Sequence, residues 1–411
     1  MPYKVFGCKV NKFFLNQWLN FYEKEKISLE NTLLIDTCVV TDRAKHKRIK
    51  EAKDYIAKGG EVLITWCGSL DRWHLISEEK FYQFYPTLLP LKNHIKLLYE
   101  SPYDDPTSKS FWNFTLKEIK KSLYTKHFVV IQNGCDNHCT FCATVLKRGI
   151  HRNRELQDII DEIKMIECQW GKEIVLTGIN LAARGCKNTK HPEESQFAVL
   201  LEEILKQTSI PRIRISSIGP EYLNDHFFEL ASEERIMPHF HFSIQSFSDK
   251  VLKDMKRNYS AQQLEEVLTK TRNIKRPHQE LISLWADIIT GFPGETEEDF
   301  QITLNGIETF WITKLHAFPF SAHTLGEGIP AKELANQLPE HIKKERNKKL
   351  IEKGEEIRTK FLALNKGSTH EVLLEEYRNG KRKGRTDNYI QVEITTDKDQ
   401  YQKGEIISYT L

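Results

Sequence analysis

Short apolar runs alternate with helical patterns through the first hundred residues. Such alternation is typical of βαβ units, which build a parallel sheet with helices on its faces. The pattern therefore predicts an N-terminal α/β domain over residues 1–105, and the polar, Pro-bearing stretch Ser101–Ser110 predicts the linker that ends it. The predicted strands of this domain are Tyr3–Phe6, Leu33–Ile35, Val62–Ile64 and Ile95–Tyr99.

The same alternation resumes after the linker and continues to about residue 320. One helix is marked by Leu156, Ile159, Ile160, Ile163 and Ile166, which form a single apolar stripe. Six βα units over residues 120–340 predict a partial (β/α)6 barrel, with its chemistry at the carboxyl ends of the strands. The predicted strands are His127–Gln132, Glu173–Thr177, Arg212–Ser216, His239–Ile244, Leu284–Thr290 and Leu315–Phe320, and further helices are predicted over Phe197–Leu205, Leu264–Arg272 and Thr296–Thr309.

The C-terminal part of the chain changes character twice. Residues 341–366 begin with a charged helical run, which predicts a connecting helix with a solvated face. The last 45 residues contain short alternating runs, Glu371–Leu374, Tyr389–Ile394 and Ile406–Tyr409, broken by Gly and Asn. They predict a small C-terminal β domain over residues 367–411. The predicted class is therefore α/β in three parts.

Composition narrows the class of protein. A chain of 411 residues with 39% hydrophobic and 10% aromatic residues suits packed domains rather than disorder. No apolar run approaches the roughly 20 residues that span a bilayer, and Met1–Asn11 lacks the apolar stretch of a signal peptide. We therefore expect a cytoplasmic protein without membrane contact. The net charge of +3 excludes a polycation, so any surface for nucleic acid must be local.

Three of the eight cysteines recur at a regular spacing. Cys8, Cys38 and Cys67 each lie just past an apolar run, separated by 30 and 29 residues. Parallel strands would bring their sulfurs to one edge of the sheet, which indicates a metal or cluster site. The alternative is three unrelated buried thiols, since free Cys is often buried.

A second set of cysteines is closely spaced. Cys135, Cys139 and Cys142 form a CxxxCxxC loop directly after the first barrel strand. Three thiolates can hold three irons of a cubane and leave the fourth iron open to a small ligand. Structural zinc would need a fourth ligand, and His138 could supply it only in a cramped geometry. Cys168 is expected to be buried in a helix, and Cys186 receives no ligand role.

The CxxxCxxC loop resembles the fingerprint of the radical S-adenosylmethionine (SAM) superfamily. The resemblance extends over nearly the whole chain to the methylthiotransferase family. Gly7–Asn11, GCKVN, is most similar to the branch that acts on N6-threonylcarbamoyladenosine beside the anticodon of tRNA, and the tail resembles the tRNA-binding TRAM domain. The other stretches that carry the resemblance are Phe6–Asn11, Asp36–Thr41, Trp66–Gly68, Glu173–Asn180, Arg212–Ile218, Pro238–His241 with Gln245–Ser246, and Asp287–Thr296.

The resemblance implies two [4Fe–4S] clusters and two molecules of SAM. Cys135, Cys139 and Cys142 would hold the cluster that cleaves SAM, and Cys8, Cys38 and Cys67 an auxiliary cluster that carries the sulfur. One SAM would methylate that sulfur and another would give the 5′-deoxyadenosyl radical, because the aromatic C2–H of adenine is too weak an acid for acid/base chemistry. The residues implied to contact SAM are Phe141, Gly178, Ser216, Gln245 and Gly291, with Asp287 either facing the pocket or serving as a structural hydrogen-bond partner.

Basic residues near the C-terminus form the candidate RNA surface. Cations that neutralise phosphate beside aromatic rings that stack on bases are typical of RNA binding. Tyr377 and Tyr389 flank the cations, which are placed in a loop between two strands. A second basic run, Arg43–Lys58, is expected to be a solvated helix face. For Arg148, Arg152 and Arg154 two roles stay open: contact with a ligand, or structural ion pairs. The candidate RNA-binding cations are Arg378, Lys381, Arg382, Lys383 and Arg385.

The function implied is methylthiolation of C2 of N6-threonylcarbamoyladenosine in tRNA. The same apparatus would serve N6-isopentenyladenosine in tRNA or an aspartate of a ribosomal protein. An interpretation from another class is a non-catalytic RNA-binding protein with structural zinc. The chain departs from the family pattern at Ala143–Gly149, at Phe247, where Gly is usual, and in its short tail. Neither the electron donor nor the sulfur source is indicated by the sequence.

Overall fold

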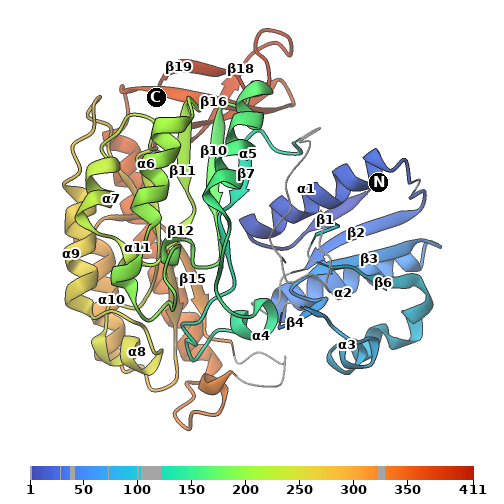
Figure 1. Cartoon of the computed structure of the whole chain (residues 1–411). Coiled ribbons are helices and arrows are strands. Elements are labelled where there is room, and N and C mark those ends of the chain that lie inside the picture. The colour runs from blue at the N-terminus through green and yellow to red at the C-terminus, as the bar shows by residue number, and fades with distance from the viewer. Residues whose placement is uncertain are drawn as a thin grey trace.

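The fold is described from a computed structural model. The structure describes residues 2–27, 29–37, 42–72, 74–99, 101–102, 122–321 and 329–411. Figure 1 shows three parts: an N-terminal α/β part beside a barrel, and a small β-sheet over one end of the barrel. The predicted α/β class is confirmed.

The N-terminal part is a parallel sheet in the order β1-β2-β3-β6. All four predicted strands are present. Apolar side chains of the strands and helices form its core, including Phe14, Ile35 and Ile64. The elements are β1 (Tyr3–Val5), α1 (Lys9–Lys24), β2 (Thr32–Thr37), α2 (Asp42–Ile56), β3 (Glu61–Trp66), β4 (Leu70–Asp71), β5 (His74–Leu75), α3 (Glu78–Phe84), the 3-10 helix Pro86–His94 and β6 (Ile95–Leu97).

The barrel is built from two parallel sheets, β7-β10-β11 and β12-β13-β14-β15. A bridge between Ile213 and Ile236 lies where the sheets meet. The six predicted strands are present, and a short additional strand, β12, follows β11. The strands are β7 (His127–Val130), β8 (Gln132–Asn133), β9 (Arg152–Asn153), β10 (Glu173–Thr177), β11 (Arg212–Ile215), β12 (Ser217–Ile218), β13 (His239–Gln245), β14 (Ser283–Thr290) and β15 (Ile312–Pro319).

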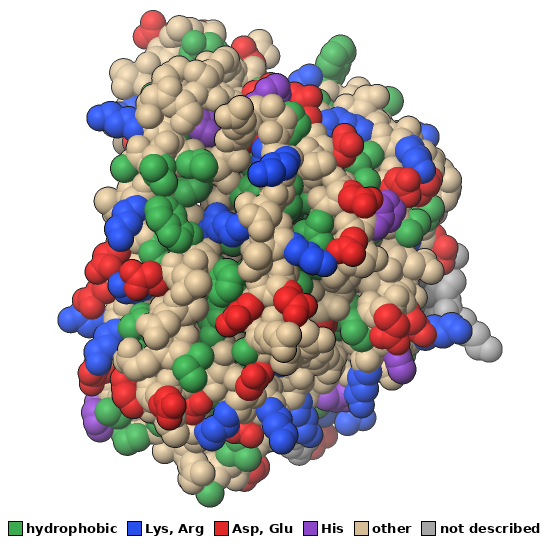
Figure 2. Space-filling model, turned by 90° about the vertical axis from the view of Figure 1, so that its left-hand side faces the viewer, with side chains coloured by type: hydrophobic (Ala, Val, Ile, Leu, Met, Phe, Trp, Pro, Cys, Tyr) green, Lys and Arg blue, Asp and Glu red, His purple; other side chains and the backbone are tan. Residues whose placement is uncertain are grey.

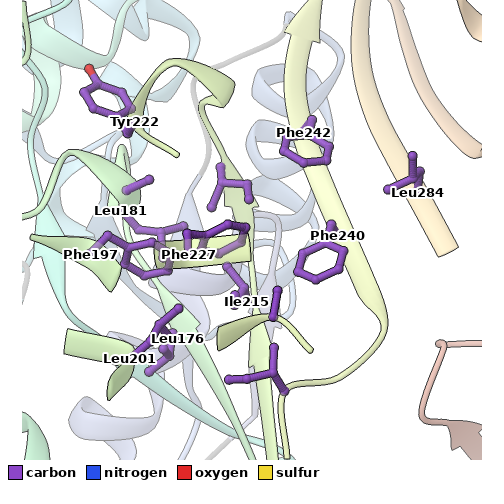
Figure 3. Packing of buried hydrophobic residues seen from close by; sticks show 14 of the residues in the cluster. Leu176, Leu181, Phe197, Leu201, Ile215, Tyr222, Phe227, Phe240, Phe242 and Leu284 are labelled. Carbon is purple, nitrogen blue, oxygen red and sulfur yellow. The ribbon is translucent and has the colours of Figure 1, made fainter. Parts of the chain in front are cut away.

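Helices cover the outside of the barrel, and the largest apolar core lies between them and the strands (Figure 3). Alternate residues of a strand face opposite sides, so Ile213 and Ile215 join this core while Arg212 and Arg214 face the interior. The helices are α4 (Thr144–Arg148), α5 (Leu156–Cys168), α6 (Phe197–Gln207), α7 (Asp225–Leu230), α8 (Asp249–Asp254), α9 (Ala261–Arg272) and α10 (Glu297–Thr309), with 3-10 turns at Leu181–Ala183, Pro192–Glu194, Pro220–Tyr222 and Pro330–Lys332.

A long helix, α11 (Glu340–Leu364), connects the barrel to the tail. The sequence predicts a solvated face for it, yet Lys343 and Arg346 are buried, and Arg346 forms an ion pair with Glu295 at 2.7 Å. This helix therefore packs on the barrel through charged residues as well as through Leu350 and Ile357, which are apolar and buried.

The tail is an antiparallel sheet in the order β18-β17-β16-β19, formed by Thr369–Arg378 (β16), Lys381–Thr386 (β17), Gln391–Thr395 (β18) and Ile406–Thr410 (β19). The predicted loop between Arg378 and Arg385 is wrong. These residues form the β16–β17 hairpin, whose turn contains Asn379 and Gly380, both with positive φ. The charged sequence of β17 carries no alternation of apolar and polar positions, so the sequence pattern does not predict this strand.

Candidate active site

The cysteine loop lies between β8 and α4, at the carboxyl end of the first barrel strand. Cys139 is buried, and Cys135 and Cys142 are partly buried. Burial is the main cause that raises the pKa of Cys135, and the neighbouring Cys142 and Cys139 raise it further. The three sulfurs therefore share a small volume in which thiolates are costly without a positive partner. This donor set fits a metal cluster, which supplies that positive charge.

Arg257 reaches the cysteine loop from the segment after α8. Its Nη1 donates to the Cys139 sulfur at 3.3 Å, and its Nη2 donates to the carbonyl of Ser243 at 3.0 Å. A hydrogen bond to a ligand sulfur is a recognised means of tuning a cluster. Sequence reasoning missed Arg257 because it is distant in the chain and belongs to no short motif.

A polar network holds the loop from its other side. The hydroxyl of Tyr222 donates to Asn137 Oδ1 at 3.1 Å, and Asn180 Nδ2 donates to that hydroxyl at 2.9 Å. His138, with φ of 49°, is exposed. The zinc alternative that used His138 as a fourth ligand therefore has no support in this arrangement.

Ser216 and Gln245 are the two candidate SAM residues at the ends of β11 and β13. Both are buried. Gln245 has φ of 70°, at the point where the register of β13 against β14 shifts. A non-glycine residue in this conformation stores strain of a kind that clusters at functional sites.

The other three SAM candidates also lie on the carboxyl side of the strands. A Cβ at Gly178 would come within 2.8 Å of Leu181, so only glycine fits there. Phe141 packs on a small apolar cluster with Met255. Gly291 donates its amide to Glu295 at 2.8 Å and lies against α11, which gives this glycine a packing role.

Cys8 and Cys67 lie at the carboxyl ends of β1 and β3, on the edge of the sheet that faces α4. Cys38 lies outside the described residues. Burial raises the pKa of Cys67, Arg148 lowers it and Cys8 raises it, so both cysteines and the guanidinium are neighbours. Arg148 Nη2 donates to Asn11 Oδ1 at 2.8 Å and lies 3.7 Å from the Cys8 sulfur. Arg148 therefore joins the two cysteine-bearing parts.

The comparisons with known proteins agree with this geometry. Residues 129–306 match the Radical SAM superfamily. The chain is 32% identical over 415 residues to threonylcarbamoyladenosine tRNA methylthiotransferase MtaB of Rickettsia prowazekii (strain Madrid E), a match that covers 95% of this chain and 90% of that protein. The chain belongs to the radical SAM methylthiotransferase family.

Other members of the methylthiotransferase family are similarly close. MtaB of Aquifex aeolicus (strain VF5) is 31% identical, over 95% of this chain and 96% of its own. The tRNA-2-methylthio-N(6)-dimethylallyladenosine synthase of the same organism is 30% identical, over 93% and 89%. Radical SAM enzymes use SAM and a [4Fe–4S] cluster, and these are the cofactors of this family member. This chain is an enzyme that methylthiolates tRNA.

The candidate RNA cations of this methylthiotransferase differ in exposure. Arg378 is exposed, and Lys381 and Lys383 lie 3.6 and 3.9 Å from Glu393. Arg382 is buried and donates to the carbonyls of Glu375 and Lys398. The guanidinium of Arg385 lies 4.7 Å from the ring centroid of Tyr389. Arg378, Lys381 and Lys383 are therefore the candidate cations most accessible to a phosphate.

Several remaining residues have structural roles. Arg154 forms a buried ion pair with Glu162, and Arg48 in the second basic run donates to Tyr85. Cys186 is buried, whereas the prediction that Cys168 is buried is wrong: it is exposed in the last turn of α5, off the apolar stripe. Phe247 stacks on Phe310, 6.0 Å between centroids.

The face of the molecule around α7 and α9 carries charges of both signs. Figure 2, which shows the side where α7 and α9 lie, has Lys and Arg interspersed with Asp and Glu. Among the described residues, no helix is long and apolar enough to cross a membrane.

Proposed function

We propose that this enzyme methylthiolates C2 of N6-threonylcarbamoyladenosine beside the anticodon of tRNA, with two SAM and two [4Fe–4S] clusters, in the cytoplasm. The proposed domains are residues 1–105, 120–340, 341–366 and 367–411, the last a TRAM-like module for tRNA. Cys135, Cys139 and Cys142 hold the cluster that binds SAM, and Cys8, Cys38 and Cys67 the auxiliary cluster.

One observation carries the two-cluster proposal. Arg148 follows the SAM-cluster cysteines on α4, and its guanidinium reaches Asn11 and the Cys8 sulfur of the N-terminal part. The two donor sets therefore face each other across one interface. When bound, the SAM cluster supplies the electron that cleaves SAM, and the auxiliary cluster supplies the sulfur. We infer that the substrate binds at this interface, where both cysteine sets can act on it.

Arg257 and Gln245 shape the side of the site that faces SAM. The Arg257 guanidinium offsets the negative charge of the Cys139 thiolate, because it donates to that sulfur. Gln245 and Ser216 offer buried polar groups at strand ends, where a bound SAM needs hydrogen-bond partners. Phe141, Gly178 and Gly291 complete the proposed contacts.

A second candidate nucleoside is N6-isopentenyladenosine, because a tRNA-2-methylthio-N(6)-dimethylallyladenosine synthase matches this chain almost as well as the MtaB proteins do. Reconstituted enzyme should be given anticodon stem-loop RNA that carries N6-threonylcarbamoyladenosine, N6-isopentenyladenosine or unmodified adenosine. We expect methylthiolation of the first RNA, with one 5′-deoxyadenosine and one S-adenosylhomocysteine for each product. Methylthiolation of the isopentenyl RNA alone would overturn the proposed nucleoside, and no product on any RNA would overturn the proposed function.

A further inference from the structure

Three side chains of the kind that bind metal ions converge inside the barrel. They are His241 on β13, Asp287 on β14 and His316 on β15, and each offers a ligand atom within 4.8 Å of the other two. Imidazole nitrogens and a carboxylate oxygen are a donor set that binds divalent transition metals, Zn²⁺ among them. Neither the proposed cluster ligands nor the proposed SAM contacts include these three residues.

The register of the sheet brings the three side chains to one face. Asp287 and His316 are direct partners between β14 and β15, and His241 is opposite Trp285, two residues before Asp287. Alternate residues of a strand share a face, so the three side chains point to the same side of the sheet. That side is the barrel interior, because the residues that flank them in the chain belong to the apolar core between strands and helices: Phe240, Phe242, Ala286, Ile288, Leu315 and Ala317.

Both imidazoles point at one oxygen of Asp287. Its Oδ1 lies 2.9 Å from His241 Nε2 and 3.2 Å from His316 Nδ1. A zinc ion about 2.1 Å from each ligand places neighbouring ligand atoms about 3.0–3.4 Å apart in octahedral or tetrahedral geometry. The separations at Asp287 thus suit ligands of one ion as well as hydrogen bonds, and the surroundings of the group favour the ion.

The second oxygen of Asp287 is held by a hydroxyl group. Ser217 Oγ, from β12, donates to Asp287 Oδ2 at 3.1 Å. Carboxylates that bind metals are commonly oriented by such an outer hydrogen bond. Ser217 therefore fixes the carboxylate with Oδ1 directed at the imidazoles.

The group is also open to solution on one side. The side chains of Asp287 and His316 are 24% and 37% exposed, whereas His241 is 7% exposed. An ion can therefore reach two of the ligands from solvent, and an entry path is one requirement of a metal site.

Three cations of the barrel interior already have anionic partners. Arg212 and Arg214 each lie 2.9 Å from Glu173, and Lys126 lies 2.8 Å from Glu375. Their charges are therefore largely offset, and they leave the carboxylate of Asp287 to the two imidazoles and Ser217.

Lys314 adds a further positive charge beside the group. Its ammonium lies 4.4 Å from the centroid of the Trp285 ring, which in turn lies 5.6 Å from His316, centroid to centroid. Tyr389 of the tail packs on the same ring at 5.1 Å, although the sequence suggested that Tyr389 flanks an RNA surface. Repulsion by Lys314 makes us expect weaker zinc binding than at a structural zinc site.

We propose that His241, Asp287 and His316 bind one Zn²⁺ inside the barrel, with Ser217 as the residue that positions the carboxylate. This site goes beyond the proposed function, since it uses no cysteine. Each imidazole binds through the nitrogen that faces Asp287 and carries its proton on the other ring nitrogen. Three protein ligands leave at least one coordination position to water.

The test incubates reconstituted holoenzyme, whose cluster-binding sulfurs are occupied, with micromolar Zn²⁺ and removes unbound ion by gel filtration. Wild-type protein should retain about one zinc for each chain, by one ion for one three-ligand site. X-ray absorption at the zinc edge should show nitrogen and oxygen ligands at about 2.0–2.2 Å and no sulfur at about 2.3 Å.

Two variants remove a ligand and one removes the outer hydrogen bond. His316→Gln and Asp287→Asn should each lower zinc affinity at least about a hundredfold, and Ser217→Ala about tenfold, since loss of an outer partner costs about 10–100-fold. His316 is the most exposed of the three ligands, so His316→Gln disturbs packing least. Cluster absorbance and melting temperature establish that each variant is folded.

His278→Gln is the matched control. His278 Nε2 lies 3.1 Å from Glu234 in an exposed pair that belongs to no three-ligand group within the described part of the chain. This variant should bind zinc as the wild type does. The proposal is overturned if wild-type holoenzyme retains no zinc, if the retained zinc has sulfur ligands, or if folded His316→Gln and Ser217→Ala both bind zinc as tightly as His278→Gln.

Discussion

The guanidinium of Arg148 lies 3.7 Å from the sulfur of Cys8, so one side chain of the barrel touches a ligand candidate of the other part. Arg148→Met removes this interaction and the donor to Asn11. We expect methylthiolation to fall at least about tenfold, since a hydrogen bond from a charged group is worth roughly 1.5–3 kcal/mol. Formation of 5′-deoxyadenosine from SAM should persist, measured in the same reaction.

Lys147→Met is the control for Arg148→Met. Lys147 extends from the same helix into the N-terminal part, where its ammonium donates to the carbonyl of Leu70 at 3.1 Å rather than to a cysteine sulfur. Equal losses in the two variants would show that docking of the parts, and not the hydrogen bond to Cys8, governs sulfur transfer.

Iron content separates the two cysteine sets. Reconstituted protein should bind about eight irons, and replacement of Cys135, Cys139 and Cys142 by Ala should leave about four, by one cubane for each triad. Cys168→Ala should keep all the iron, because this cysteine is exposed and apart from both sets. A folded triple variant with no iron would contradict independent sites.

The β16–β17 hairpin should contribute to the salt dependence of tRNA binding. Replacement of Arg378, Lys381 and Lys383 by Gln should weaken tRNA binding and flatten the plot of log affinity against log salt by about 0.7–0.9 for each phosphate that is no longer neutralised. The surface pairs with Glu393 are weak competitors for these lysines. Arg382→Gln should instead lower the free energy of unfolding by about 1–3 kcal/mol, since its donors are buried. An unaltered salt slope in the triple variant would show that the hairpin does not hold phosphate.

The phenol of Tyr389 should have an unusually low pKa. Burial alone would raise its pKa, but Lys126, Arg214 and Lys9 outweigh burial and lower the pKa to about 8. Tyrosinate absorbance should therefore appear near pH 8 in folded protein and vanish from that range in Tyr389→Phe. The pKa lies below the usual value of about 10, so the ionised form favours folding. Its contribution to stability is complete above about pH 10 and is lost as the pH falls through about 8. A wild-type titration identical to that of Tyr389→Phe would disprove the placement of this ring.

Strands with apolar runs were predictable, because burial on both faces leaves a direct mark on the sequence. The run in β10 (Glu173–Thr177) is such a case, and the prediction is confirmed with the same bounds. The strand β17 was not predictable in this way, because its residues are charged and its pairing is set by neighbouring strands.

The candidate site was predictable where spacing along the chain carries the chemistry, as in Cys135, Cys139 and Cys142. The positions of Arg257 and Tyr389 depend on contacts between segments far apart in the chain. The hydroxyl of Tyr389, for example, lies 3.1 Å from the ammonium of Lys126. No local pattern indicates which distant group a lysine or tyrosine will meet, so only the fold reveals them.

Nucleoside mass spectrometry of tRNA from cells that lack this gene tests the central claim most directly. The account predicts that 2-methylthio-N6-threonylcarbamoyladenosine disappears, that N6-threonylcarbamoyladenosine accumulates, and that the wild-type gene restores the methylthio form while Cys135→Ala does not. Unchanged 2-methylthio-N6-threonylcarbamoyladenosine in those cells would contradict it.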